Sequence, residues 1–225
     1  PGTGETVEGF KEKGFLPSGF LNFLALLGWN DGTERELYSL EELVKTFSLE
    51  RVHSSGAKFD YEKAKWFNQE WIKRTASSSL VLQVQQLLQN EGIQVTDLSL
   101  LETVIDKVKE RCHLLADFVP QTMYFFKEPA TYDLAAIQPK WSKEKVVFFE
   151  ELLIDFSQLK DWRAEALENC FKEVAARKNL KPGELQLPLR IMLVGGKFGP
   201  PVFEIAALLG PESTRSRIQS VFKQL

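Results

Sequence analysis

The residue types that most often carry catalysis are scarce in this sequence. Its two histidines, His53 and His113, lie 60 positions apart, and neither has a neighbouring carboxylate or second histidine at metal-ligand spacing. A serine or cysteine nucleophile would need a histidine base and a group that orients it, and no such arrangement or nucleophile elbow is found. The pattern argues against hydrolases that use a histidine base or a zinc ion.

Phosphate-binding loops and acid–base pairs are equally weak candidates. The two glycine-rich stretches, Gly2–Thr6 and Gly195–Lys197, lack both the Walker spacing and a preceding strand. The acidic pairs Glu41–Glu42 and Glu150–Glu151 could act as acid and base. Carboxylates of this kind more often lie near helix starts, where the helix dipole stabilises them. We therefore expect binding rather than catalysis from these residues.

Composition indicates an ordinary soluble protein. Of the 225 residues, 44% are hydrophobic and 26% are charged, which is enough apolar material for a packed core. The apolar runs are shorter than the roughly 20 residues that cross a bilayer, so we expect a cytoplasmic protein without membrane contact. The two cysteines, Cys112 and Cys170, are predicted to be buried thiols rather than a disulfide or a metal site.

Charge is unevenly distributed along the chain. The net charge is −3, but residues 77–159 carry 7 Lys and Arg against 12 Asp and Glu, whereas residues 177–225 carry 8 against 3. A basic surface could face nucleic-acid phosphates, which supply most sequence-independent affinity. It could equally be a solvated face, so charge alone does not decide between these interpretations.

Most of the chain has the apolar spacing of helices. Apolar residues recur three and four positions apart, and strand alternation is hard to find. Helix starts are indicated by Pro17, by the N-cap Asp60, and by capping boxes at Ser39–Glu42 and Ser99–Glu102. Pro182 is interpreted as a break. After it we predict three short helices, near residues 189–194, 202–209 and 212–223.

These elements predict an all-α fold of irregular helical bundles in an elongated two-part array. No repeat of fixed period is present, which excludes the common solenoids. The small polar run 75–79 is the first expected boundary. It gives a first domain over residues 1–76 and a second over 77–225, with subdomains of about 77–138 and 139–225.

Several separate stretches resemble the glutamyl-tRNA synthetase family of the bacterial type. The segment after that family's catalytic Lys-Ser-Lys-Arg-type loop is similar in order and spacing to Gly14–Pro17, Leu21–Trp29, Phe47–Val52 and Phe59–Tyr61. The family's C-terminal anticodon-binding motif is similar to Leu187–Arg190, the glycine loop through Pro200, and Phe203–Gly210. Its basic helix in the first anticodon-binding subdomain is similar to Val108–Cys112 with Leu114–Leu115.

The resemblance implies a C-terminal fragment: a stem-contact domain over residues 1–76, then an anticodon-binding helical cage. Such a fragment would position glutamate tRNA for aminoacylation by the catalytic domain of the same polypeptide, acting as a monomer. The family's His-Ile-Gly-His-type and Lys-Ser-Lys-Arg-type motifs do not occur in these residues. ATP and glutamate are therefore expected to bind the missing catalytic domain, and this fragment is expected to have no cofactor, no metal and no enzyme activity of its own.

The resemblance also implies RNA-binding residues. Anticodon contacts are expected from Arg111, Lys107, Arg190, Lys197 and Phe198. Contacts with the stem and its backbone are expected from Arg51, Lys58, Lys63, Lys65 and Arg74. The guanidinium of Arg111 is planar and only donates hydrogen bonds, which suits the acceptor edge of cytosine, the third anticodon base of glutamate tRNAs.

Alternatives remain open for these residues. Arg111 could be a surface cation in a last helical turn, and Phe198 could pack inward in an ordinary turn between helices. The family's Leu-Thr-Gly is here Leu193-Val194-Gly195, and its Ser-Gly-Pro is Phe198-Gly199-Pro200, so hydroxyl contacts to RNA are not expected there. A helical module that binds proteins and not RNA is the competing function.

Overall fold

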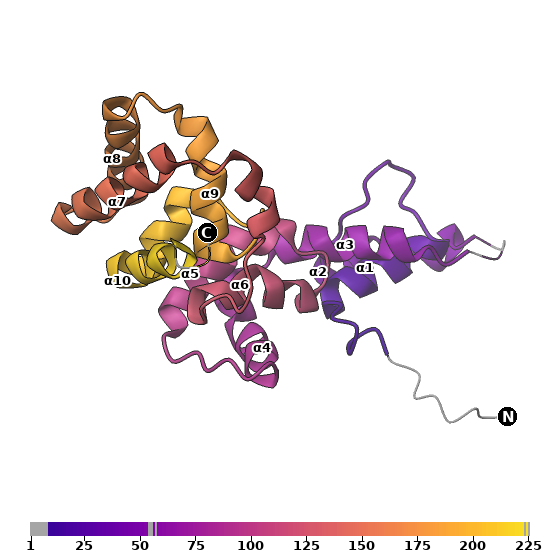
Figure 1. Ribbon diagram of the computed structural model, residues 1–225. Helices are drawn as coiled ribbons and strands as arrows, with labels where there is room; N and C mark the ends of the chain where they lie inside the picture. The colour runs from indigo at the N-terminus through magenta and orange to yellow at the C-terminus, as the bar shows by residue number, and fades with distance from the viewer. Residues whose placement is uncertain (1–8, 54–55, 57, 223, 225) are drawn as a thin grey trace, which may run out of the picture. The chain divides into compact units, whose positions relative to one another are not determined.

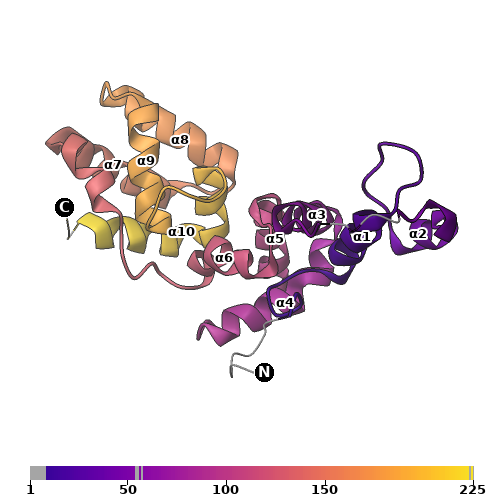
Figure 2. The ribbon, with the colours of Figure 1, turned by 90° about the vertical axis from the view of Figure 1, so that its right-hand side faces the viewer.

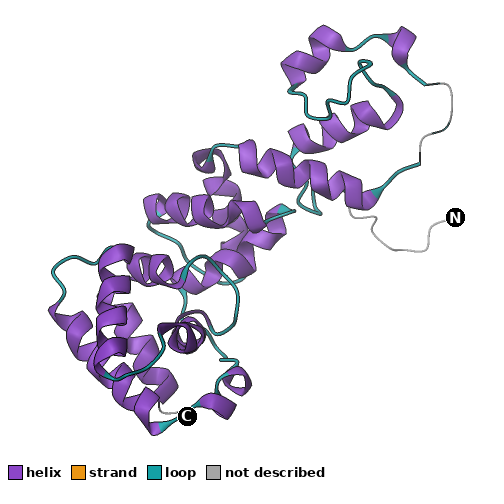
Figure 3. Ribbon diagram, turned by 90° about the horizontal axis from the view of Figure 1, so that it is seen from above, coloured by secondary structure: helices purple, strands orange, loops and turns teal. Residues whose placement is uncertain are grey.

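The computed structural model describes residues 9–53, 56, 58–222 and 224 (Figure 1). Over these residues the chain is built from helices and loops, and an isolated antiparallel bridge between Trp29 and Val52 belongs to no named strand. Figure 3 accordingly shows the described chain as helix and loop. The prediction of an all-α fold is confirmed. The chain divides into two compact units, Pro1–Pro120 and Gln121–Leu225.

The first unit consists of short helices connected by turns. In chain order they are α1 (Pro17–Gly28), α2 (Leu40–Thr46), the 3-10 turn η1 (Leu49–Arg51), α3 (Tyr61–Arg74), α4 (Ser77–Asn90), α5 (Leu98–Val108), and the 3-10 turns η2 (Lys109–Arg111) and η3 (Leu115–Asp117). Helix α6 (Phe118–Phe126) begins in this unit and continues into the second.

The core of the first unit has two parts. Helices α1 and α3 lie side by side (Figure 2), and their interface buries Phe15, Phe23, Ala64 and Phe67. Helices α4 and α5 pack through a second apolar stripe that is also removed from solvent. Gly19 allows the close approach of α1 to α3, because a Cβ at that position would lie 2.9 Å from the Cα of Asn68.

Helix starts follow the predicted chemistry at most positions. Pro17 occupies the first turn of α1, Asp60 caps α3, and Ser39 with Glu42 forms a complete capping box at α2. The capping box predicted at Ser99 is wrong, because the carboxylate of Asp97 accepts from the amide of Leu100 and starts α5 earlier. Both residues are good caps, and the earlier one adds two helical residues, Leu98 and Ser99, to the start of the helix.

The second unit is a cluster of longer helices. After the 3-10 turns η4 (Leu134–Ala136) and η5 (Gln138–Lys140) come α7 (Lys143–Gln158), α8 (Ala164–Arg177), α9 (Pro182–Val194) and α10 (Val202–Phe222). Helix α10 contacts each of α7, α8 and α9 (Figure 2). Phe148, Phe171 and Phe203 form a chain of edge-on ring contacts, with centroids 5.1 Å apart in each pair, that joins α7, α8 and α10. Gly210, at φ 78°, interrupts α10 between residues 202–209 and 211–222.

The helix start near residue 189 was predicted too late. Pro182 does not end a helix but occupies the first turn of α9. Backbone amides in a first turn have no acceptor within the helix, so a proline there costs no hydrogen bond. Pro188 lies inside the same helix, which therefore runs unbroken to Val194. The two segments predicted beyond residue 202 are confirmed as the two halves of α10.

The compact units do not divide where the composition changes. The boundary expected between residues 76 and 77 lies between α3 and α4, inside the first unit. The reason is that α3 is hydrogen-bonded to the chain that follows α5: Asn68 donates to the carbonyl of His113, and Gln69 donates to the carbonyl of Glu110. The boundaries predicted at 76/77 and 138/139 divide the chain by its sequence pattern and its resemblance to a family, and not by compact packing, so they remain predictions.

Both cysteines are buried free thiols, as predicted. Burial raises the pKa of Cys112 to about 12 and that of Cys170 to about 11. Since the thiolate is the reactive form, neither side chain is suited to nucleophilic chemistry near neutral pH. Within the described residues, none of the helices combines the length and the apolar character needed to cross a membrane.

Candidate nucleic-acid interface

Arg111 ends a turn that is held in place by another helix. Helix α5 passes directly into η2, and the amide of Cys112 closes this turn by donating to the carbonyl of Lys109 at 3.1 Å. Gln69 of α3 donates to the carbonyl of Glu110 at 3.0 Å. The backbone on which Arg111 is mounted is therefore fixed from two sides.

The chain just after Arg111 is fixed as firmly. The fully buried Asn68 donates to the carbonyl of His113 at 2.6 Å. The carboxylate of Asp117 accepts from the amides of His113 and Leu114 at 2.8 and 2.9 Å. These bonds leave little freedom to the backbone, which is what a base-reading side chain requires of its support.

The guanidinium of Arg111 is exposed and lightly engaged. Its Nη1 donates to the carbonyl of Lys107 at 3.4 Å, and no carboxylate of the described chain forms an ion pair with it. Lys107 is also exposed, one turn earlier on α5. Most of the five N–H donors of Arg111 are thus available to a ligand.

The glycine loop of the second unit joins α9 to α10. Gly195 ends α9 in the left-handed region at φ 85°, and Gly199 has φ 100°. A Cβ at Gly196 would lie 2.6 Å from the ring of Phe198, so glycine lets that ring cover the backbone. Phe198 is 44% exposed and meets Tyr124 edge-on, with ring centroids 5.8 Å apart. One part of the ring is therefore packed and another is open, and the stacking of Phe198 on a base stays a prediction.

The side chain of Arg190 binds the backbone of this loop. Its Nη1 lies 3.0, 3.3 and 2.7 Å from the carbonyl oxygens of Phe198, Gly199 and Pro200. A single nitrogen directed at three consecutive carbonyls fixes the path of the loop. This geometry gives Arg190 a positioning role. Lys197 is more exposed, and its ammonium lies 3.5 Å from the carboxylate of Asp133.

Replacing Arg190 by methionine should loosen the glycine loop without unfolding the unit. Hydrogen bonds to a charged donor contribute about 1.5–3 kcal/mol, so we expect the amides of Phe198 and Gly199 to exchange hydrogen roughly tenfold faster or more. Hydrogen exchange followed by NMR would measure this. Lys197→Met is the matched control, and an equal acceleration in both variants would contradict the role given to Arg190.

The cations predicted for stem contact are not all on one face. Lys63 and Arg74 are eleven positions apart on α3 and share a face, whereas Lys65 lies on another. Lys63 pairs with Glu36 at 2.7 Å and Lys65 with Glu62 at 2.9 Å, each on the surface. Surface pairs of this kind are weak, at about 0–1 kcal/mol, so phosphates could displace the carboxylates.

Three of these cations share one neighbouring segment, residues 31–37. Arg51 donates to the carbonyl of Asp31, Lys63 pairs with Glu36, and Arg74 lines a hollow of about 400 Å³ that includes Glu34. Lys58 is exposed and makes no hydrogen bond or ion pair that the structure describes. Because carboxylates accompany these cations, we expect the stem patch to attract phosphates less strongly than its lysine and arginine content implies.

With this geometry in view, comparisons with known proteins identify the family. The family described as "Anticodon binding domain" matches residues 61–222. The chain belongs to this anticodon-binding family. A second model, described as "tRNA synthetases class I (E and Q), catalytic domain", matches residues 4–66. That range lies within the segment expected to be a stem-contact domain, so part of this segment is shared with the catalytic-domain model.

Relatives of this anticodon-binding chain are curated as glutamate–tRNA ligases. The ligase of Flavobacterium johnsoniae is 39% identical over 217 residues, covering 96% of this chain and 43% of the relative. The ligase of Porphyromonas gingivalis W83 is 34% identical over 225 residues, covering all of this chain and 44% of the relative. A crystal structure of a glutamate tRNA ligase from Elizabethkingia meningosepticum has a TM-score of 0.91 at 34% identity, and the match covers 99% of this chain and 44% of that one. The chain thus spans less than half the length of these relatives.

The residues that position both candidate surfaces of this anticodon-binding chain escaped the sequence analysis. Asn68 and Gln69 fix the Arg111 turn, and the buried Arg217 contacts the ends of the helices beside the glycine loop. The available signal was a polar residue at an apolar position of a helix, as for Asn68 directly after the buried Phe67. The apolar periodicity of the helix shows only that a polar residue interrupts its buried face, and it does not indicate which backbone group that residue binds.

Proposed function

We propose that this chain binds the anticodon arm of glutamate tRNA and positions that tRNA for aminoacylation. The reaction would take place in a catalytic domain of the same protein that lies outside these residues and binds ATP and glutamate. In this proposal Arg111 reads the third anticodon base, and Lys107, one turn earlier in the chain, also contacts the anticodon. Lys197 and Phe198 form a second contact, by charge and by stacking, on the loop that Arg190 positions.

The observation that carries the proposal is the state of Arg111. A guanidinium with no carboxylate partner, on a backbone turn fixed by α3, presents its donors to solvent. RNA loops splay their bases, whose acceptor edges match such donors. The family and the relatives support anticodon binding by the chain independently of this geometry.

An apolar groove on α1 and α2 supports the link to a catalytic domain. The groove has a volume of about 650 Å³, and its lining includes Leu24, Leu40 and Val44, which are 42%, 57% and 75% exposed. Contiguous exposed apolar surface of this kind usually marks an interface. Because residues 4–66 match the catalytic-domain family, the remainder of that domain is the partner we propose for it.

Substituting Arg111 by alanine should weaken binding of a cognate anticodon stem-loop by about 1–3 kcal/mol and reduce discrimination at one base. The measurement is fluorescence anisotropy with labelled stem-loops that carry cytosine or another base at the third anticodon position. Wild-type protein should prefer cytosine, and the variant should bind the two RNAs with similar affinity.

Lys45→Ala, a change of an exposed cation on α2, is the matched control and should leave both affinities nearly unchanged. An Arg111→Ala variant with wild-type affinity and wild-type discrimination would disprove the assignment. Titrations at several salt concentrations test the broader claim, because phosphate contacts make the logarithm of the affinity fall with the logarithm of salt. Absence of RNA binding at low salt would favour the protein-binding alternative.

A further inference from the structure

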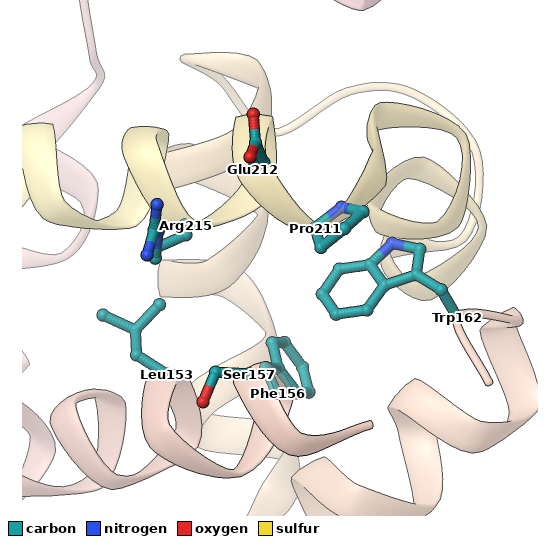
Figure 4. A pocket seen from close by; sticks show the side chains of 7 residues that line it. All are labelled: Leu153, Phe156, Ser157, Trp162, Pro211, Glu212 and Arg215. Atoms are coloured by element: carbon teal, nitrogen blue, oxygen red, sulfur yellow. The ribbon is translucent and has the colours of Figure 1, made fainter. Parts of the chain in front are cut away.

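A small cavity in the second unit lies apart from the residues proposed to contact RNA. It has a volume of about 250 Å³ and opens where the last turns of α7, the connection to α8 and the interruption of α10 meet (Figure 4). Pockets for drug-sized ligands have volumes of about 300–1,000 Å³, so this cavity suits one ring system with a short substituent.

The walls of the cavity are fixed by contacts within the protein. The indole Nε1 of Trp162 donates to the carbonyl of Ala206 at 3.0 Å, and its ring meets Phe156 edge-on at 5.5 Å. Gly210, at φ 78°, breaks α10, and the ring of Pro211, the next residue, lines the cavity beside Trp162 (Figure 4). A ligand would enter a cavity whose walls are already in place.

One side of the cavity is apolar and has no hydrogen-bond donor left to offer. Phe156, Trp162 and Pro211 form it, and the single N–H among these side chains is already bound. The hydroxyl of Ser157 donates to the carbonyl of Ile154 at 2.6 Å. The acceptor atoms of a nucleobase would be buried there without donors, which is unfavourable. A phenyl or indole ring would bury none or only one polar group.

The other side of the cavity carries charge. Arg215 lines it and makes no hydrogen bond or ion pair with any residue that the structure describes. Figure 4 shows its guanidinium beside Leu153, across the cavity from Trp162. Glu212, one turn earlier on α10, also lines the cavity. An apolar side facing an available guanidinium defines a ligand with a ring at one end and an anion at the other.

We propose that this cavity binds an aromatic carboxylic acid, with its ring against Trp162 and Pro211 and its carboxylate on Arg215. Guanidinium and carboxylate are complementary planar groups that can form two parallel hydrogen bonds. The same chemistry exists in a free aromatic acid and at the C-terminus of a peptide that ends in an aromatic residue. The site is independent of RNA binding.

The test compares an acid with its neutral amide on the whole chain. N-acetyl-tryptophan and N-acetyl-tryptophanamide are titrated while NMR follows the indole N–H of Trp162 and the Nε–H of Arg215. The acid should bind about fivefold more tightly than the amide, as expected for one charge-assisted contact on a partly open surface. Arg215→Gln should bring this ratio to about one without changing binding of the amide.

Glu212→Gln should increase the preference for the acid over the amide, because it removes a negative charge beside the bound carboxylate. Leu153→Trp should fill the cavity and abolish binding of both probes, with circular dichroism confirming that the variant is folded. Indole-3-acetate and the tripeptide Ala-Ala-Trp distinguish a free acid from a peptide end, since the preferred source binds more tightly than the other.

Three results would overturn the proposal. The first is equal binding of acid and amide by the wild-type chain. The second is an acid-to-amide ratio that Arg215→Gln leaves unchanged. The third is an anticodon stem-loop that shifts both resonances when neither probe does, which would assign the cavity to RNA.

Discussion

Replacing Asn68 by leucine should destabilise the first unit by about 2–6 kcal/mol, because the buried amide of Leu16 and the partly buried carbonyl of His113 would each lose a partner worth about 1–3 kcal/mol. Its Oδ1 accepts from the amide of Leu16 at 2.7 Å, and its Nδ2 donates to the carbonyl of His113 at 2.6 Å. Leucine has a similar volume but can do neither. Urea unfolding would measure the loss, with hydrogen exchange identifying the amides that lose protection.

The same substitution should also weaken RNA binding. Since the His113 carbonyl lies two residues after Arg111, releasing it frees the turn that carries the proposed base reader. We expect Asn68→Leu to weaken the cognate stem-loop more than the base-swapped one at temperatures where the unit is still folded. Asn90→Leu, on the exposed end of α4, is the matched control. An unfolding free energy within about 0.5 kcal/mol of wild type, the usual range for surface changes, would contradict the argument.

The contrast between Asn68 and the helix caps explains how far the sequence could be interpreted. A capping box is a local device: Ser39 and Glu42 meet across three residues, so spacing alone predicts it correctly. Asn68 bridges to partners 52 and 45 positions away, and no local pattern encodes such distances. The all-α class and most helix starts were therefore predictable, while the support of the Arg111 turn was not.

Arg190 shows the same limit for the candidate site. Family resemblance selected it as an RNA contact, which stays a prediction, and the structure shows its side chain bracing the loop carbonyls of residues 198–200. Residue type identifies a donor with five N–H groups, but only the fold shows which acceptors it reaches. For Arg111 the fold leaves the donors available, so its proposed role stays a prediction for the stem-loop experiment to test.

Arg217 is a buried side chain of the second unit that binds backbone groups distant in sequence, as Asn68 is in the first. It is only 3% exposed, and it donates from Nη1 to the carbonyl of Leu193 at 2.6 Å and from Nη2 to that of Lys127 at 3.4 Å. Those carbonyls are at the C-terminal ends of α9 and α6, where helix dipoles favour a cation. The carbonyl of Gly195, at the start of the glycine loop, in turn accepts from the amide of Asp133 at 2.8 Å. One buried guanidinium thus secures the helix ends beside this loop.

Arg217→Met should destabilise the second unit by about 2–5 kcal/mol, since two helix-end carbonyls lose a charged donor in a buried site. Thermal unfolding followed by circular dichroism would measure it, with Arg215→Met, an exposed change on the same helix, as the control. Burial lowers the pKa of Arg217, and it would lower that of a lysine in the same place into a measurable range.

The Arg217→Lys variant should therefore become more stable, relative to wild type, as pH rises. Between the depressed pKa in the folded state and about 10.4 in the unfolded state, the unfolded chain binds more protons, so its unfolding free energy increases with pH. Wild type, whose guanidinium stays protonated throughout, lacks this increase. If both variants unfold like wild type, or if the lysine variant has the pH profile of wild type, the cation is not buried at the helix ends, and the glycine loop must be secured by other contacts.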